Sequence, residues 1–72
     1  DSNSYFQEMA QEHTVITPSY KTTKEEGPDH DKNFTVGVYL EKEHVVSGEG
    51  RSKQEAEQDA ARKGLESKGW MK

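Results

Sequence analysis

A strict alternation of residue types over positions 34–40 constrains the fold of this chain more than any other feature. The run FTVGVYL places its Phe, Val and Leu residues on one side only, at Phe34, Val36, Val38 and Leu40. Successive side chains of a β-strand point to opposite faces, so this period of two indicates a strand with one buried face. A turn at 41–43 and a further extended run at 44–47 follow. The sequence therefore predicts an antiparallel hairpin that is covered on one side.

A first helix is predicted over residues 4–13, ahead of the strands. Its core-facing residues recur at i, i+3, i+4 and i+7, which is the spacing of one helical stripe, and they are Phe6, Met9, Ala10 and His13. Ser4 and Gln7 are spaced as a capping box. Three neighbouring residues compete for the N-cap position, namely Asp1, Ser2 and Asn3. Pro18 prevents the helix from continuing.

A second helix is predicted to begin at a capping box formed by Ser52 and Glu55. Asp59 and Lys63 are spaced to pair at i, i+4, and Gly69 is a natural C-terminal stop. One side of the helix carries mostly small residues, which are Ala56, Ala60, Ala61, Gly64 and Leu65. A glycine inside a helix costs about 1 kcal/mol relative to alanine. We therefore expect the backbone of this helix to lie close to the surface that it covers.

The remaining segments complete an α-β-β-β-α order. Residues 19–25 are rich in Thr and Tyr and suggest a first strand, and the polar loop 25–33 contains the Gly27-Pro28 turn signal. Both helices must bury their apolar stripes, so we predict an α+β fold with two helices packed on one face of a three-stranded antiparallel sheet. We interpret residues 1–72 as one domain. Because the first residue is Asp1 and not Met, we expect this domain to come from a longer chain.

The composition limits the class of protein. Hydrophobic residues make up 28% of the chain and charged residues 33%, which alone would be typical of disorder. The regular spacing of the few apolar residues argues instead for a small core. The chain has no cysteine, which fits a reducing compartment, and we predict a cytoplasmic location. No long apolar run is present, so we expect no contact with a membrane.

Neither a catalytic site nor a metal site is predicted. The chain has three His and many carboxylates, but none forms a visibly buried pair, and no Ser lies in a nucleophile motif. Asp29, His30 and Asp31, with His13 or His44, could be imagined as metal ligands. Consecutive loop residues rarely converge on one ion, so this alternative is disfavoured.

Three polar segments are candidates for binding. The start of the second helix combines Arg51 and Lys53 with free backbone N–H groups, an arrangement suited to phosphate. The polar side of the first helix carries Ser4, Gln7, Glu8 and Gln11, and some of these side chains both donate and accept hydrogen bonds, as ribose hydroxyls do. The third segment is the GPDH turn at 27–30. Each segment is also compatible with an ordinary solvated surface.

Taken in order, these segments resemble the double-stranded-RNA-binding domain, and most closely the version at the C-terminal end of bacterial ribonuclease III. The resemblance extends from residue 1 to about residue 68. It depends on the polar first helix, on the GPDH turn followed by FTVGV at 34–38, and on the run SKQEAEQDAA at 52–61. Members of this family have the α-β-β-β-α order and contact two successive minor grooves and the phosphates between them.

The resemblance implies a role for each segment. The first helix would meet 2′-hydroxyls in one minor groove, the turn would enter the next minor groove, and the start of the second helix would contact the intervening phosphates. The implied RNA-binding residues are Ser4, Gln7, Glu8, Gln11, Pro28, Asp29, His30, Arg51, Ser52, Lys53 and Gln54. The family usually has a second basic residue at the position of Gln54. Many eukaryotic members have a lysine at the position of Glu57, where ribonuclease III-type domains tend to have glutamate. We therefore expect weak binding by the isolated domain.

The resemblance also implies the biological setting. We expect sequence-independent binding of A-form RNA that positions the duplex for a ribonuclease III-type nuclease domain outside this chain. This domain would need no cofactor, and Mg²⁺ would serve only the nuclease domain. We expect the isolated domain to be monomeric and the parent nuclease to be a homodimer. The alternative is a protein-interaction module of the same fold, with Tyr39 on the outer face of the sheet as an anchor.

Overall fold

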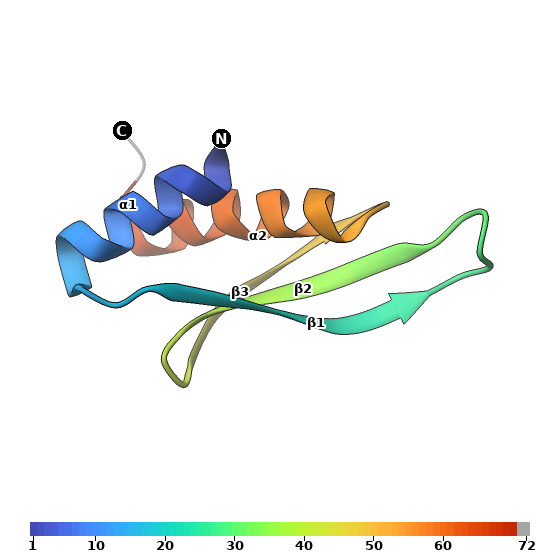
Figure 1. The fold of residues 1–72 in the computed structure, drawn as a ribbon, viewed down its shortest axis with the longest axis horizontal. Helices are drawn as coiled ribbons and strands as arrows, with labels where there is room; N and C mark the ends of the chain where they lie inside the picture. Colours follow the sequence, from blue (N-terminus) through green and yellow to red (C-terminus); the bar gives the residue numbers. More distant parts are fainter. Residues whose placement is uncertain (71–72) are drawn as a thin grey trace.

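The computed structural model describes residues 1–70 and contains five elements. In chain order they are α1 (Ser2–Thr14), β1 (Pro18–Glu26), β2 (Asn33–Leu40), β3 (Glu43–Gly50) and α2 (Lys53–Lys68). The strands form one antiparallel sheet in the order β1-β2-β3. Both helices lie on the same side of this sheet (Figure 1). The predicted α+β architecture is therefore confirmed.

The core lies between the helices and the face of β2 that the alternation predicts. Val36, Val38 and Leu40 are buried there, together with Phe6 and Leu65 from the helices. Phe34 is only half-buried. The β1–β2 hairpin extends past the start of α2 (Figure 1), so no helix covers the strand at that end. The predicted buried face is confirmed, but its coverage ends before Phe34.

β3 is longer than predicted and begins one residue earlier. It spans Glu43–Gly50, so the turn is reduced to Glu41 and Lys42, and Glu41 adopts a left-handed backbone with φ 56°. The register between β2 and β3 shifts at Val45, because Val38 pairs with Val46 while Tyr39 pairs with His44. The residues 48–50 were predicted to lie outside the strand, and this was wrong.

The glycines at the end of β3 are explained by the closeness of α2. A Cβ atom at Gly48 would lie 2.1 Å from the backbone nitrogen of Ala60 and 2.6 Å from the carbonyl oxygen of Ala56. Gly64 has a similar role further along α2, because a Cβ atom there would lie 3.0 Å from the Phe6 ring. The predicted close approach of the small-residue side of α2 is confirmed.

α1 begins earlier than predicted, and its cap is one of the predicted candidates. The helix starts at Ser2, and the Asp1 carboxylate accepts a hydrogen bond of 2.8 Å from the backbone N–H of Ser4. Asp1, one of the residues expected to compete for this position, is thus the N-cap, and the alternative capping box of Ser4 and Gln7 does not begin the helix. The buried residues of α1 are Phe6, Met9 and Ala10, as predicted.

His13 was predicted in the apolar stripe of the first helix, but it is exposed. Its ring stacks on Trp70 with centroids 5.0 Å apart and an interplanar angle of 5°, and Trp70 also stacks on Phe6 at 5.6 Å. Gly69 ends α2 in a left-handed conformation, and the Trp70 N–H donates to the Leu65 carbonyl at 2.9 Å. This helix end turns Trp70 back onto α1.

Candidate nucleic-acid interface

The start of α2 presents an exposed cation next to free backbone donors. Ser52 is the N-cap, and its hydroxyl accepts a hydrogen bond of 3.1 Å from the Glu55 N–H. Lys53 occupies the first turn, is exposed, and makes no ion pair within residues 1–70. The positive end of the helix dipole adds to the charge of its ammonium group. An anion approaching this end of α2 would be attracted by the Lys53 ammonium group and by the helix dipole.

The polar side of α1 is open to solvent over its whole length. It lies opposite the buried Phe6, Met9 and Ala10. The exposed residues on this side are the predicted ones, Ser4, Gln7, Glu8 and Gln11. The Gln11 amide donates a hydrogen bond of 2.7 Å to the Thr17 hydroxyl just beyond the helix. This contact limits the mobility of one of the predicted groove-contacting side chains.

The β1–β2 loop is a tight turn with an exposed tip. Gly27 has φ 96°, and a Cβ atom there would lie 2.4 Å from the Asp31 carbonyl oxygen, so glycine is required. The Asp31 N–H donates to the Pro28 carbonyl at 2.9 Å and closes the turn. Asp29 and His30 lie at its exposed tip. The loop therefore has a defined shape before any ligand is present.

Lys32 braces this loop against β1. Its ammonium lies 3.0 Å from Glu25 and 3.6 Å from Asp29. The hydrogen bond and charge of Lys32 hold the pKa of Glu25 below its ordinary value, and the charge of Lys53 adds to this effect. Lys53 of α2 is therefore close enough to the base of the loop to influence its electrostatics.

Arg51 connects the loop to α2 directly. Its guanidinium donates to the Asp31 carboxylate in an ion pair between two exposed side chains. Arg51 was predicted to face phosphate, and the structure pairs it with the loop. Residues 25–33 carry a net charge of −3 and residues 51–72 a net charge of +2. This complementarity was the only sequence signal for the contact, and it does not identify the partners.

Glu57 of α2 lies near enough to Tyr20 of β1 for its charge to act on the Tyr20 hydroxyl. Burial, and then the charge of Glu57, raise the pKa of Tyr20 in β1 to about 12. Residues at i and i+4 share one side of a helix. Lys53, one turn before Glu57, therefore lies on the same side, in agreement with its influence on Glu25.

The three predicted segments follow one another along the molecule. Its extents are 40 × 24 × 16 Å, and Figure 1, with the long axis horizontal, shows α1, the start of α2 and the β1–β2 loop in succession. α1 is tied to α2 where the Asn3 N–H donates to the Gln58 side chain at 3.3 Å. One contact therefore links the residue before the α2 cap to the loop, and another links the second turn of α2 to α1.

Comparison with known proteins places this arrangement in a family. Residues 4–68 match the family model described as the double-stranded RNA binding motif. The chain belongs to this family. The matched stretch of the motif includes every residue predicted to contact RNA.

Several curated relatives of the chain are ribonucleases. The chain is 44% identical over 66 residues to Ribonuclease 3 of Syntrophobacter fumaroxidans, covering 92% of the chain and 27% of that protein. It is 49% identical over 61 residues to Ribonuclease 3 of Borreliella burgdorferi, covering 85% of the chain and 25% of that protein. The match to Ribonuclease 3 of Nitratiruptor is 45% over 65 residues, covering 90% and 29%. The chain spans about a quarter of the length of these relatives.

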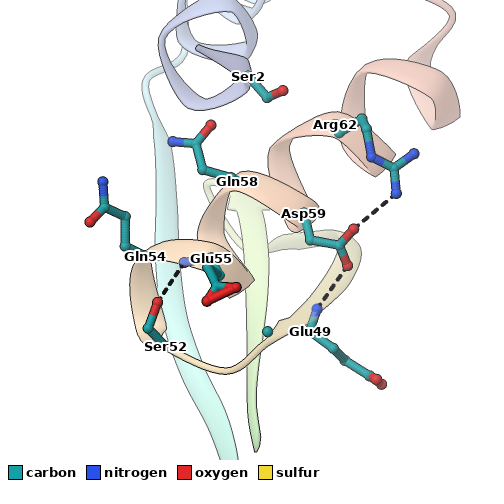
Figure 2. Close-up of a pocket in the computed structure, with 9 residues that line it drawn as sticks. Ser2, Glu49, Ser52, Gln54, Glu55, Gln58, Asp59 and Arg62 are labelled. Carbon is teal, nitrogen blue, oxygen red and sulfur yellow. Dashed lines mark hydrogen bonds and ion pairs between the residues drawn. The ribbon is translucent and has the colours of Figure 1, made fainter.

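A cleft of about 480 Å³ lies beside the start of α2 (Figure 2). Two predicted RNA-binding residues, Ser52 and Gln54, line it together with Gln58 and Arg62. Its walls also carry the carboxylates of Glu49, Glu55 and Asp59. These acidic groups make the cleft unsuited to phosphate.

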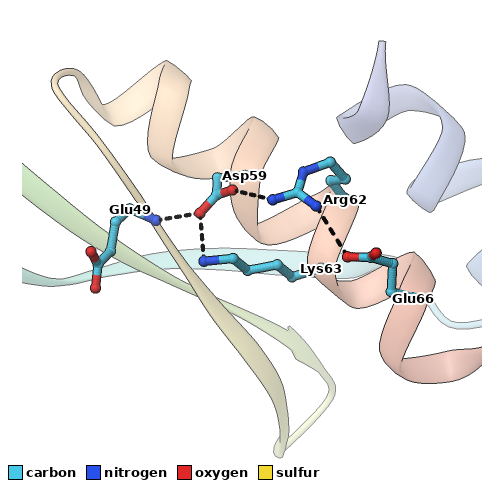
Figure 3. A network of polar contacts seen from close by, with 5 residues as sticks. All are labelled: Glu49, Asp59, Arg62, Lys63 and Glu66. Carbon is cyan, nitrogen blue, oxygen red and sulfur yellow. Dashed lines mark hydrogen bonds and ion pairs between the residues drawn. The ribbon is translucent and has the colours of Figure 1, made fainter.

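Asp59 joins the end of β3 to α2. Its carboxylate accepts hydrogen bonds of 2.9 Å from the Glu49 N–H, 2.8 Å from Lys63 and 2.9 Å from Arg62 (Figure 3). The predicted pair between Asp59 and Lys63 is therefore confirmed, as one part of a larger network. The network fixes the β3–α2 connection, which contains Arg51 and Ser52.

The Asp59 network predicts a loss of stability in acid. Partial burial alone would raise the Asp59 pKa, but the hydrogen bonds from Lys63, Glu49 and Arg62 outweigh it and lower this pKa from 3.8 to about 2. The stabilisation is therefore complete above pH 3.8 and is lost as pH falls toward 2. We expect the free energy of unfolding to fall by about 1–2 kcal/mol over this interval through Asp59.

Urea unfolding measured between pH 7 and pH 2 tests this expectation. The Asp59→Asn variant should be less stable than the wild type at pH 7, with a correspondingly smaller loss in acid. Glu12→Gln, which removes an exposed carboxylate from α1, is the matched control and should follow the wild-type profile. If Asp59→Asn retained the full acid dependence, other carboxylates would have to account for it.

The described residues provide neither a metal site nor a membrane-spanning helix. Within residues 1–70 no group of three or more His, Cys, Asp or Glu side chains is placed to hold a metal ion. In the same part of the chain, neither helix has the length and apolar character needed to cross a bilayer.

Proposed function

We propose that this domain binds A-form double-stranded RNA through its shape and not its sequence. The observation that supports the proposal most directly is the succession of α1, the start of α2 and the β1–β2 loop, held together by Asn3–Gln58 and Arg51–Asp31 contacts. Domains of this type span about 16 base pairs and touch two minor grooves and the phosphates between them. Three prearranged contact segments are what such a footprint requires.

Each segment matches the chemistry of one part of the duplex. Gln7 and Gln11 carry amides that can both donate to and accept from a 2′-hydroxyl. The loop offers backbone carbonyls and the His30 ring to the next minor groove. Lys53 and the N–H groups of the first turn of α2 offer positive charge to the phosphates. The deep, narrow major groove of A-form RNA admits no side-chain readout, so binding should be insensitive to sequence.

The affinity of the isolated domain should be modest. The chain carries a net charge of −4, and Gln54 provides no charge where the family usually has a basic residue. Each missing phosphate contact removes about 0.9 from the slope of log K against log salt concentration, by analogy with duplex DNA. We expect dissociation constants in the micromolar range or weaker at physiological salt.

Titration with matched RNA and DNA duplexes tests the function. We expect the wild-type domain to prefer RNA and to respond in NMR spectra at residues 4–11, 27–31 and 51–54 together. Gln7→Ala and His30→Ala should each reduce the preference for RNA by about two- to fivefold, because 2′-hydroxyl contacts distinguish the two duplexes. Glu12→Ala on α1, outside the predicted contact set, is the control.

Two RNA duplexes of unrelated sequence should bind with equal affinity. Equal binding of RNA and DNA by the wild-type domain would contradict the minor-groove roles of α1 and the loop. A strong difference between the two RNA sequences would contradict recognition by shape.

A protein-interaction module remains the alternative, with the outer face of the sheet as its contact surface. On that face the Tyr39 ring packs over Gly37, at 3.0 Å from the position of a Cβ atom there, and lies 5.2 Å from the His44 ring. Part of the Tyr39 ring surface is thus already in contact with other residues of the domain. Under this alternative the substitutions at Gln7 and His30 would leave partner binding unchanged.

The names of the relatives suggest the role of the longer protein. We propose that this domain holds duplex RNA for a ribonuclease III-type nuclease domain, which would supply the Mg²⁺-dependent cleavage, act as a homodimer and work in the cytoplasm. The domain by itself, which we expect to be monomeric, should bind duplex RNA without cutting it. Incubation with labelled duplex and Mg²⁺, followed by gel analysis, tests that expectation.

A further inference from the structure

We propose that Arg51 is a positioning residue, whose ion pair with Asp31 sets the spacing between the β1–β2 loop and the start of α2. The pair would hold the loop where it and Lys53 can contact one duplex together. This inference rests on the proposed function. It assigns Asp31 a role in binding, although Asp31 is acidic and would repel phosphate by itself.

Both partners are rigidly connected to the segments that they would position. Asp31 closes the loop through its N–H bond to the Pro28 carbonyl, and the tight turn at Gly27 packs against the Asp31 carbonyl. Arg51 directly precedes the Ser52 cap of α2. A displacement of Asp31 relative to Arg51 is therefore a displacement of the loop tip relative to the helix start.

The pair is suited to positioning more than to stability. Both side chains are largely exposed, at 66% for Arg51 and 57% for Asp31. Exposed ion pairs add little to folding, so loss of this one should shift the Tm by less than about 8 °C. The contact joins one guanidinium nitrogen of Arg51 to one carboxylate oxygen of Asp31, so it limits the distance between the two segments.

The charges of Arg51 and Lys53 should act differently on RNA. The charge of Arg51 is compensated by Asp31, whereas Lys53 makes no ion pair within residues 1–70. Only a cation that neutralises a phosphate releases a counterion and contributes to the salt dependence of binding. Arg51 should therefore influence affinity through geometry and leave the salt slope unchanged.

Salt titrations of Arg51→Ala and Lys53→Ala with one RNA duplex separate the two roles. Arg51→Ala should weaken binding by about fivefold, because a loop that samples several positions is correctly placed for only part of the time. Its slope of log K against log salt should equal that of the wild type. Lys53→Ala should reduce the slope by about 0.9.

A charge swap and a measurement without RNA complete the test. The effect of Asp31→Arg on RNA affinity should be measured in two backgrounds, the wild type and Arg51→Asp. We expect the gain in affinity to be larger in the Arg51→Asp background, where the substitution restores an ion pair. In the free domain, Arg51→Ala should lower the backbone NMR order parameters of residues 27–32, while Lys53→Ala should not.

Each outcome is decisive for one of the two claims. A reduced salt slope for Arg51→Ala would show a direct phosphate contact and overturn the positioning role. Unchanged affinity, additive charge-swap effects or unchanged loop order parameters would overturn it as well. If the wild type fails to bind duplex RNA while the loop becomes more mobile in Arg51→Ala, the proposed function is wrong. The role of the Arg51–Asp31 ion pair in positioning the loop would then still hold.

Discussion

Replacement of Gly48 by alanine is expected to lower the Tm of the domain by about 12–24 °C. The added Cβ atom would lie 2.1 Å from the Ala60 nitrogen and 2.6 Å from both the Ala60 Cα atom and the Ala56 carbonyl oxygen. All three are backbone atoms of α2, so no side-chain rotation can relieve the overlap. The helix must move away from β3, and overpacking of this kind costs about 3 kcal/mol or more. In a domain of this size each kcal/mol corresponds to about 4–8 °C.

Gly37→Ala provides the matched control in the same sheet. The three atoms nearest to its Cβ atom would all belong to the Tyr39 side chain, at 3.0–3.3 Å, and that side chain can turn away. Because alanine is also favoured over glycine inside a strand by about 0.5–1 kcal/mol, we expect little net change. Thermal unfolding followed by circular dichroism compares the two variants. Equal melting temperatures for Gly48→Ala and the wild type would mean that α2 does not pack on β3 at this distance.

The elements of the fold could be predicted because their signals are local. The period of two across 34–40 identified β2 and its buried face, and the spacing of Ser52 and Glu55 identified the start of α2. The core-facing side of β3 at Gly48 could not be found in this way. A Gly-x-Gly sequence is typical of a flexible segment, and only the contact with Ala56 and Ala60 of α2 explains why glycines continue the strand.

The errors at the ends of the elements also have physical causes. Several residues could cap α1, and the preference of Asp1 for the backbone N–H of Ser4 decided among them. His13 has the spacing of a core residue, but it lies at the last turn of α1, beyond the part that α2 covers. Trp70 packs against it only because α2 ends in a left-handed turn at Gly69.

The candidate site shows the same division between local and long-range information. Residue type and spacing were sufficient to select the polar side of α1, the GPDH turn and the start of α2. The relation between these segments was not accessible, because Arg51 and Asp31 are 20 positions apart and many other charge pairs were possible. Because Arg51 pairs with Asp31, Lys53 is the cation at the start of α2 that is available to a phosphate. The largest effect on RNA binding is therefore expected from a substitution at Lys53.

Lys53→Ala is expected to weaken binding to duplex RNA by about tenfold near 0.1 M salt. Each phosphate contact contributes about 0.9 to the slope of log K against log salt concentration. Relative to 1 M salt, loss of one contact therefore lowers log K by about 0.9 at 0.1 M salt, and it flattens the slope by about 0.9. The loss should be equal for duplexes of unrelated sequence, because phosphates carry no sequence information. Fluorescence anisotropy over a series of salt concentrations measures both quantities.

Lys42→Ala distinguishes a local contact from a general effect of net charge. Lys42 is also an exposed lysine, but it lies in the β2–β3 turn, at the end of the sheet far from the start of α2 (Figure 1). Its removal changes the net charge by the same amount and should alter affinity by less than twofold, since charges beyond the Debye length of about 10 Å are largely screened. Gln54→Lys should act in the opposite direction to Lys53→Ala, with tighter binding and a steeper slope. If Lys42→Ala and Lys53→Ala were equally weak binders, the attraction would be diffuse and the start of α2 would not be a phosphate contact.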